Sequence, residues 1–398
     1  MAATFLTGAT GFIGSEVLRR LLRRERERQV YALVRAADAA EAARRGREVL
    51  FKLFFDDEAA TADGKRRVHW VIGNLKQPGL GLAPEARERI VADCGELIHA
   101  AASTDWDRPL EMAEAVNVEG VRAVVELAAE VARRPGPSRL VHISTAFVAG
   151  RRNGVIRAED LPGPAGPFNN TYEATKAQAE RYVRERMGEV PVTVVRPSIV
   201  VGDSTTGRTF NFNVIYFPIK LLQHGLLPVV PGRRTTTLDI VPVDYVCDAL
   251  LALARDPAAV GRTFHVTADA DAMRLPEFLD RIVAFLAERR ASLGAAAGGK
   301  PGVRRPRVIG PLGWAALLWW LRRTLPRLPR RQMDAFNKYL PFILSEKRFV
   351  ATETRTALEG RVAYPPIATY LERVAEYAVT REWGEDVSWD PALLRDPG

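Results

Sequence analysis

The stretch that decides the fold is TFLTGATGFIG, residues 4–14, at the start of the chain. Its first residues are apolar and predict a short buried strand over Thr4–Leu6. Three glycines follow at intervals of three, Gly8, Gly11 and Gly14. Beyond them, apolar side chains recur at helical spacing with arginines on the opposite face, which predicts an amphipathic helix. The chain therefore opens with a strand, a glycine-rich turn and a helix.

Strands and helices continue to alternate over the first two thirds of the sequence. Short runs that are apolar throughout are typical of strands in a parallel sheet covered on both faces. The sequence therefore predicts an α/β fold, a doubly wound (Rossmann) parallel sheet with a smaller, mainly helical C-terminal part. The expected strands are Val30–Val34, Val68–Ile72, Leu97–His99, Leu140–Ile143, Val192–Val195 and Phe264–Val266, and the expected helices are Val116–Val131, Thr171–Met187 and Leu275–Leu286.

The glycine-rich turn has the pattern of a dinucleotide-binding site. Glycine permits the tight turn, the close approach of the backbone to a pyrophosphate and the close packing of helix on strand. The helix N-terminus adds N–H groups and the positive end of the helix dipole. A turn without a ligand is the alternative, but its place between the first strand and the first helix favours a nucleotide site.

The end of the second expected strand indicates which nucleotide binds. An acidic residue there suits the ribose hydroxyls of NAD, whereas an arginine suits the 2′-phosphate of NADP. Val34 is followed by Arg35, and the nearest acid is Asp38. We therefore predict NADPH as the cofactor, with a merely solvated arginine as the alternative.

Three residues predict an acid–base site. Tyr172 and Lys176 lie four residues apart, so they share one face of the expected helix. A phenol has a pKa of about 10, and an ammonium about 4 Å away favours the phenolate by up to about 4 kcal/mol at an effective dielectric near 20. We expect Lys176 to lower the pKa of Tyr172 towards 7, against an opposing effect of burial. Thr145 follows Leu140–Ile143, at the sheet edge where ligands bind.

The chain is longer than one compact domain usually is, with 398 residues of which 47% are hydrophobic. The alternation of strands and helices weakens after Gly202, and Gly294–Gly302 has the composition of a flexible linker. We expect an NADP-binding domain with the catalytic site over residues 1–270, and a substrate-binding region over residues 271–398.

Composition excludes several classes of function. The net charge of +9 comes from arginines spread along the chain, and no run has the basic and aromatic pattern of a nucleic-acid reader. Cys94 and Cys247 make neither a disulfide framework nor a zinc site, and no histidine has metal-ligand spacing, so we expect no metal and a cytoplasmic location. Four polar residues are interpreted as structural: His99 and His142 as satisfied histidines, and Asp239 and Asp244 as turn and helix-cap residues.

In their order, these motifs resemble those of the extended short-chain dehydrogenase/reductase superfamily, and more closely its thioester-reductase and fatty acyl-CoA reductase branch, with a male-sterility-type NAD-binding domain. The resemblance covers residues 1–255. The matching stretches are TGATGFIG, VYALVRAAD, GNLKQPGLGL, LIHAAAS, NVEG, HISTAFVAG, TYEATKAQAE, RPSIVVG and DIVPVDYVCDAL.

The resemblance implies a set of site residues. Thr145, Tyr172 and Lys176 match the catalytic residues of the family. Asn74 stands where this branch commonly has an aspartate beside the adenine. The residues expected to bind the cofactor are Thr7, Gly8, Thr10, Gly11, Phe12, Ile13, Gly14, Arg35, Asn74, Leu75, Ala101, Tyr172, Lys176, Pro197 and Ile199.

The resemblance also implies an activity, the NADPH-dependent reduction of an acyl thioester, on coenzyme A or an acyl carrier protein, to an aldehyde and on to a primary alcohol. The tail YLPFILSEKRFVATETRTAL, Tyr339–Leu358, resembles the C-terminal segment of alcohol-forming fatty acyl-CoA reductases, although Val350 and Glu353 replace its usual Asp and Asn. Two alternatives stay open: a reductase or epimerase acting on another carbonyl or sugar nucleotide, and an NADP-binding regulator without turnover. The tail disfavours the first, and the presence of both Tyr172 and Lys176 disfavours the second.

One further segment, Trp314–Arg331, is aromatic and basic. Its apolar run Gly313–Leu321 is too short to span a bilayer. Three interpretations remain open: peripheral contact with a membrane surface, part of a lid over an acyl pocket, or a helix packed in the C-terminal core. The sequence does not determine the oligomeric state.

Overall fold

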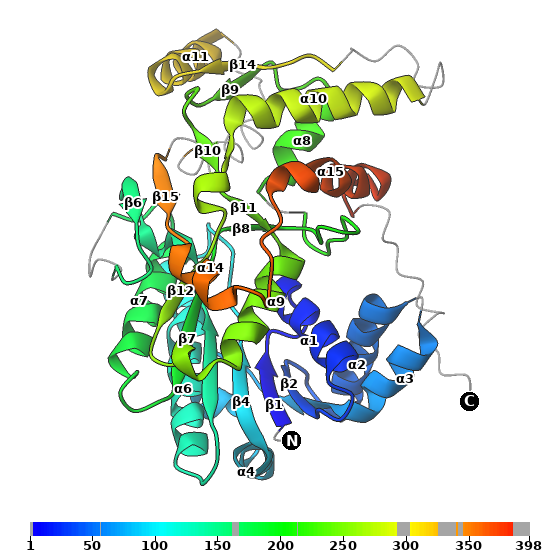
Figure 1. The fold of residues 1–398 in the computed structure, drawn as a ribbon, viewed down its shortest axis with the longest axis vertical. Coiled ribbons are helices and arrows are strands. Elements are labelled where there is room, and N and C mark those ends of the chain that lie inside the picture. Colours follow the sequence, from blue (N-terminus) through cyan, green and yellow to red (C-terminus); the bar gives the residue numbers. More distant parts are fainter. Residues whose placement is uncertain are drawn as a thin grey trace.

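The computed structural model describes residues 3–55, 57–160, 167–212, 214–292, 303–324, 340 and 345–384. The expected linker Gly294–Gly302 lies outside these described residues. Within them, the chain forms a covered parallel sheet with a second group of helices and short strands above it (Figure 1).

The central sheet has seven strands, and every neighbouring pair in it is parallel. The strand order is β12-β7-β5-β4-β1-β2-β3, so the chain direction across the sheet reverses between β1 and β4. Such a switch point opens a crevice at the carboxyl ends of the strands. The doubly wound sheet is thereby confirmed, with each expected strand present: β1 Ala3–Thr7, β2 Val30–Val34, β3 Val68–Ile72, β4 Cys94–His99, β5 Arg139–Ile143, β7 Val192–Pro197 and β12 Thr263–Val266.

Helices cover both faces of this sheet, because each face is apolar. One apolar core lies between the sheet and the helices α1 (Phe12–Arg24), α2 (Ala39–Phe54), α3 (Glu58–Arg67) and α9 (Val243–Ala254). Another lies under α4 (Pro84–Asp93), α6 (Glu119–Ala132) and α7 (Thr171–Glu185), and α5 (Leu110–Asn117) packs on α6 and α7. The helix expected over Val116–Val131 is divided at Val118 between α5 and α6.

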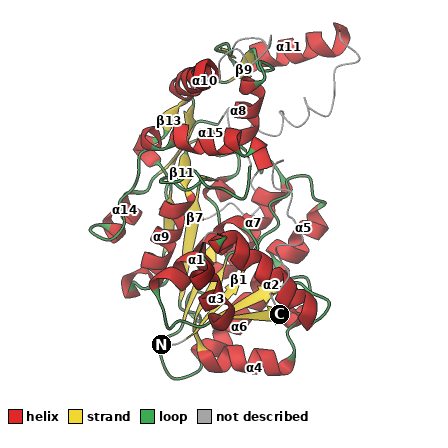
Figure 2. Cartoon of the chain, turned by 90° about the vertical axis from the view of Figure 1, so that its right-hand side faces the viewer, coloured by secondary structure: helices red, strands yellow, loops and turns green. Residues whose placement is uncertain are grey.

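A separate apolar core lies beyond the carboxyl ends of the strands (Figure 2). It is built from α8 (Tyr216–Gln223), β9 (Val229–Pro231), α10 (Leu275–Ser292) and α15 (Leu371–Thr380). These elements come from both sides of residue 270, and the expected division into 1–270 and 271–398 stays a prediction. The remaining elements here are β8 Ile199–Val201, β10 Thr237–Leu238, β11 Ile240–Pro242, β13 Met273–Arg274, β14 Arg307–Ile309 and α11 Pro311–Thr324.

The C-terminal segment returns to the main sheet. The strand β15 (Lys347–Phe349) pairs in parallel with β6 (Gly154–Ile156), and α14 (Thr352–Leu358) packs on α9 and β12. Both cysteines are buried and free. Among the described helices, none is at once long enough and apolar enough to cross a bilayer.

Candidate active site

The turn between β1 and α1 has a geometry that requires glycine. Gly8 has a φ of +81°, and a Cβ there would lie 2.7 Å from the carbonyl carbon of Ala100. At Gly14 a Cβ would lie 2.1 Å from the carbonyl oxygen of Gly8. The first turn of α1 therefore packs directly against the end of β1, and its N-terminus opens at the switch point of the sheet.

A cleft of about 400 Å³ lies at this switch point. Arg45, from α2, lines it together with the end of β2 and also lines an adjoining hollow of about 460 Å³. Sequence reasoning missed Arg45 because it did not predict α2. The expected cofactor residues that line the cleft are Gly8, Thr10, Gly11, Arg35, Asn74, Leu75 and Ala101.

The other expected cofactor residues lie around the cleft in different ways. Thr7 is fully buried beneath it, with its hydroxyl 2.7 Å from Nδ1 of His99. Phe12 lines the adjoining hollow, and Ile13 packs on the core under α1. Pro197 is buried at the end of β7, while Ile199 lines an apolar pocket above the sheet.

Thr145, Tyr172 and Lys176 come together at the carboxyl end of β5. Asn170 caps α7 by accepting a hydrogen bond from the backbone N–H of Glu173 at 2.9 Å, so the helix begins at Thr171. The Thr145 hydroxyl is hydrogen-bonded to the phenol of Tyr172. The Lys176 ammonium donates to the carbonyl of Ile143, the last residue of β5, at 2.7 Å.

The ionisation of this pair differs from the sequence-based expectation. Burial raises the pKa of Tyr172 to about 12, and the hydrogen bond to Thr145 offsets only part of this. Burial also lowers the pKa of Lys176 to about 8. The expected lowering of the Tyr172 pKa towards 7 is therefore wrong, because desolvation of the buried phenol is the largest influence on that pKa. Tyr172 holds its proton at neutral pH.

A buried charge network beneath these residues holds them in place. Glu180, one turn after Lys176, accepts a hydrogen bond from Ser144 at 2.6 Å, and Ser144 adjoins Thr145. The guanidinium of Arg196 on β7 binds both carboxylate oxygens of Glu180, at 2.6 and 2.9 Å. Both side chains are excluded from solvent. Burial raises the pKa of Glu180, but Arg196 and its other partners hold that pKa below the ordinary value.

The same network reaches the C-terminal segment. Arg196 lies 3.2 Å from Nε2 of His265 on β12, and the other ring nitrogen of His265 lies 3.1 Å from the carbonyl oxygen of Val350, next to β15. Arg196 also donates to the carbonyl of Asp160. One arginine thus connects β7, α7, β12 and the returning tail. Sequence reasoning treated RPSIVVG only as a neighbour of the cofactor and missed this arginine.

A second connection joins α7 to the wall of the cleft. Asn117 at the end of α5 accepts from the backbone N–H of Ser103 at 2.7 Å and donates to its carbonyl at 3.0 Å. The same amide donates to Thr175 of α7 at 3.0 Å. The asparagine of NVEG therefore fixes the loop after β4 against the helix that carries Tyr172 and Lys176.

Two histidines lie side by side near Lys176. The rings of His99 and His142 are stacked with centroids 5.5 Å apart. Burial lowers the pKa of His99 to about 3 and that of His142 well below its usual value, so both rings are neutral. Among the described residues, neither ring nitrogen of His142 nor Nε2 of His99 has a hydrogen-bond partner. The interpretation as a satisfied histidine is therefore wrong for His142, whereas His99 is satisfied at Nδ1 by Thr7 and unpaired at Nε2.

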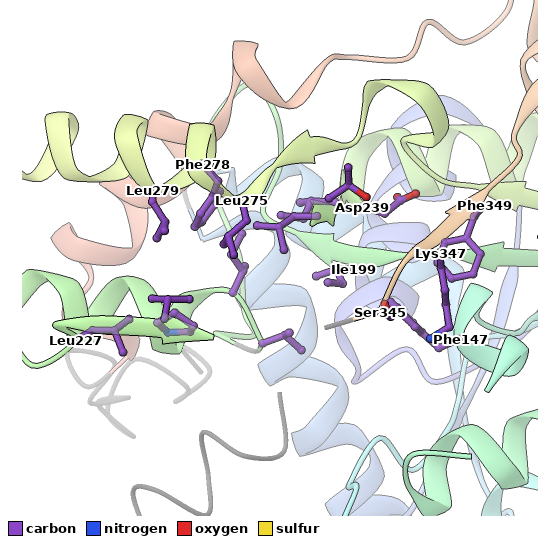
Figure 3. Close-up of a pocket in the computed structure, with 17 residues that line it drawn as sticks. Phe147, Ile199, Leu227, Asp239, Leu275, Phe278, Leu279, Ser345, Lys347 and Phe349 are labelled. Atoms are coloured by element: carbon purple, nitrogen blue, oxygen red, sulfur yellow. The ribbon is translucent and has the colours of Figure 1, made fainter. Parts of the chain in front are cut away.

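An apolar pocket of about 70 Å³ lies beyond the end of β5, with Phe147 among its lining residues (Figure 3). At one end it is lined by Phe147, whose backbone N–H donates to the hydroxyl of Thr145 at 3.3 Å. At the other end lie apolar side chains of the separate core beyond the strand ends, called the upper core below. Among them are Leu227, Leu275, Phe278 and Leu279. The pocket therefore leads from Phe147, beside Thr145, into the region of α10.

Two charged residues that sequence reasoning did not promote line this pocket. Asp239 accepts from the backbone N–H of Ala268 at 2.8 Å, and burial raises its pKa to about 6. Its interpretation as a turn residue is wrong, and Asp244 binds Ser204 in the first turn of α9 instead of capping that helix. Burial lowers the pKa of Lys347 on β15, against the attraction of Glu173.

Comparison with known proteins agrees with this geometry. The family model described as "Male sterility protein" matches residues 6–250. The chain belongs to this family. The domain of the male sterility protein family binds a nicotinamide dinucleotide, so the cofactor of the chain is of this class.

Curated members of the family are similar over the same region. Fatty acyl-CoA reductase wat of Drosophila melanogaster is 31% identical over 283 residues, which are 64% of this chain and 54% of that protein. The L-2-aminoadipate reductase large subunit of Penicillium chrysogenum is 33% identical over 281 residues, 66% of this chain and 19% of that protein. The match thus spans about half the length of the first relative and a fifth of the second.

Solved structures extend the likeness to nearly the whole chain. The terminal R domain from the myxalamid PKS-NRPS biosynthetic pathway has a TM-score of 0.76 and 26% identity, with 96% of this chain and 92% of that chain covered. The R domain of a nonribosomal peptide synthetase from Mycobacterium tuberculosis, at 19% identity and a TM-score of 0.67 over 96% of this chain and 92% of that chain, shows the same fold. The resemblance to extended short-chain reductases of the thioester-reductase branch is confirmed.

Proposed function

We propose that this chain reduces an acyl thioester to an aldehyde with NADPH. The observation that carries the proposal is the meeting of Thr145, Tyr172 and Lys176 at one sheet edge, between a dinucleotide cleft and an apolar pocket. A thioester fits this arrangement because its carbonyl is polar and its acyl chain is apolar. The relative named as a fatty acyl-CoA reductase supports the same class of substrate.

The residues of the cleft fit NADPH. Gly8 and Gly14 leave the backbone of the turn close to the helix N-terminus, where a pyrophosphate binds. Arg35 after β2 and Arg45 of α2 line the same cleft. Two guanidinium groups suit the doubly charged 2′-phosphate, which NADH lacks.

The chemistry divides between the cofactor and the chain. When bound, NADPH supplies the hydride that the acyl carbon receives. Thr145 donates a hydrogen bond to the substrate oxygen, and Tyr172, which holds its proton at neutral pH, donates a proton or hydrogen bond as negative charge develops there. Lys176, one helical turn after Tyr172, holds its positive charge at the end of β5. As the C–S bond of the adduct breaks, its electron pair leaves with the sulfur and the hydroxyl of the adduct gives up its proton. The thiolate takes up one proton, so an aldehyde and a free thiol remain.

We propose further that the aldehyde accepts a second hydride in the same site and leaves as a primary alcohol. The same three side chains serve this step, because an aldehyde oxygen becomes an alkoxide that needs one proton. The likeness of Tyr339–Leu358 to the tail of alcohol-forming reductases supports this step. The carrier, coenzyme A or an acyl carrier protein, is part of the same proposal.

The test is to incubate the protein with NADPH and a panel of acyl-CoA and acyl-carrier thioesters. The proposal predicts one free thiol for each thioester consumed, with aldehyde or alcohol identified by mass spectrometry. Two NADPH oxidised per thiol would support alcohol as the product. Oxidation of NADPH with no release of thiol from any member of the panel would refute thioester reduction.

The proposed role of the two arginines gives a prediction on cofactor choice. Replacing Arg35 or Arg45 with glutamine removes one charge-assisted contact, worth about 1.5–3 kcal/mol. We expect the KM for NADPH to rise about 10- to 100-fold while the KM for NADH stays nearly constant. Arg66→Gln, at an exposed arginine of α3 away from the cleft, is the control. An unchanged NADPH preference in Arg35→Gln/Arg45→Gln would contradict the assignment.

The proposed role of Lys176 gives a prediction on pH. Its pKa is lowered to about 8, so its charge is present below that pH and lost as the pH rises through it. Glu180 favours the charged form, and His99 and His142 are neutral neighbours. We expect kcat/KM to fall towards tenfold per pH unit above about 8. Lys176→Arg keeps the positive charge at higher pH, so the fall in kcat/KM above pH 8 should disappear in this variant. If kcat/KM still falls there, another group causes the pH dependence.

A further inference from the structure

The helix α11 is apolar on two opposite faces. Trp314 is half-buried and packs against the upper core, with Leu317 and Leu318 also half-buried. The other side is exposed, at 87% for Leu312, 58% for Trp319 and 53% for Trp320. The exposed residues Leu312, Ala315, Ala316 and Trp319 recur at helical spacing, so they form one apolar stripe.

The stripe lies at one end of the molecule. The strand β14, just before α11, pairs in parallel with β9, with Val308 opposite Val230. Figures 1 and 2 both show α11 at the end of the upper group of elements that is farthest from the central sheet. A flat surface can therefore approach this end without meeting the sheet or its covering helices.

The sequence around the stripe carries charge of one sign. Residues 289–333 contain eleven arginines and lysines and no aspartate or glutamate. One of these arginines, Arg323, places its guanidinium 4.3 Å from the ring centroid of Trp319. Arg323 thus places a basic group beside the exposed apolar stripe, and this charge favours an anionic surface.

We propose that α11 docks on an anionic lipid surface, with Leu312, Trp319 and Trp320 entering the headgroup and upper acyl region. Tryptophan favours this interface because its ring is apolar and its N–H is polar. Arginine at the border pairs with lipid phosphates and keeps its charge in water. An acidic protein would match the arginines, but it offers no apolar medium for the whole stripe.

The docking face is close to the apolar pocket. Val230, on the strand that pairs with β14, lines that pocket, and so does Leu227 just before it. Docking of α11 would place this apolar pocket beside the bilayer. This consequence rests on the proposed function, because long-chain acyl thioesters concentrate at a bilayer surface. The docking itself does not depend on turnover, so its test uses binding alone.

The test is co-sedimentation of the full chain with vesicles of phosphatidylcholine, with and without phosphatidylglycerol. We expect binding to the anionic vesicles and a fall in binding at high salt. Trp319→Ser should weaken binding about tenfold or more, because it removes a large apolar side chain that is buried on docking. Phe55→Ser removes an aromatic residue that is 56% exposed at the far end of α2, and it should bind as wild type does.

A second variant and a fluorescence measurement also test the proposal. Arg323→Gln should weaken binding to anionic vesicles and leave the weak binding to neutral vesicles unchanged. Brominated lipids should quench tryptophan fluorescence in the wild type more than in Trp319→Ser. The proposal is overturned by no binding to anionic vesicles, by equal binding of Trp319→Ser and wild type, or by Trp319-dependent binding to an acyl carrier protein in place of vesicles.

Discussion

Replacing Tyr172 with phenylalanine should lower the turnover of an acyl thioester by about 10²- to 10⁴-fold, the usual contribution of a positioned proton donor. The phenol is hydrogen-bonded to Thr145 and protonated at neutral pH, so it can serve as the proton donor of the proposed reaction. The ring itself remains in the variant. We therefore expect the Kd for NADPH and the melting temperature to stay near wild type.

The measurement is kcat with a saturating thioester, next to NADPH binding by fluorescence. Tyr182→Phe is the matched control, because Tyr182 lies on the same helix and stacks against Arg122 away from the site. Its kcat should equal that of wild type. A Tyr172→Phe variant with more than half of the wild-type kcat would show that another group donates the proton.

Replacing Glu180 with leucine should lower the free energy of unfolding by about 3–5 kcal/mol, because Arg196 then keeps an uncompensated charge in the interior. Ser144 loses its acceptor in the same variant, so Thr145 beside it should also lose its fixed position. Urea unfolding measures the stability, and kcat measures the effect on the site. Glu185→Leu, at an exposed position of α7, should change the stability by less than about 0.5 kcal/mol.

A double variant separates charge from shape. In Glu180→Leu/Arg196→Met neither charge is left alone, so most of the lost stability should return. The kcat should stay low, because Ser144 still has no partner. A Glu180→Leu variant as stable as wild type would contradict the account of the network.

The sheet was predictable because its signals are local. Each apolar run, such as Val30–Val34 and Val68–Ile72, forms the strand expected there, and the glycine turn lies between β1 and α1. Helices with a weak apolar period were not seen, among them α3, whose sequence EAATADGKRR is mostly polar. Arg45 escaped notice for the related reason that its helix, α2, was not expected.

The interior of the site was less predictable because it depends on contacts between distant residues. Glu180 and Arg196 are 16 residues apart, and Lys347 reaches the pocket from the tail. The pKa of Tyr172 was predicted in the wrong direction because the burial of a phenol is not visible in the spacing of Tyr172 and Lys176. Thr145 and Tyr172 are nevertheless hydrogen-bonded, and Lys176 reaches the end of the same strand, since strand end and helix start fix their places.

The most direct test of the central claim follows a deuterium atom from cofactor to product. The protein is incubated with an acyl thioester and NADPH that carries two deuterium atoms at the reactive carbon of the nicotinamide. Hydride delivery at this site predicts one deuterium on C1 of the aldehyde, or two on C1 of the alcohol, with free thiol released in equal amount to the product. Product without deuterium on C1, or thiol released as fast without the cofactor, would contradict the account.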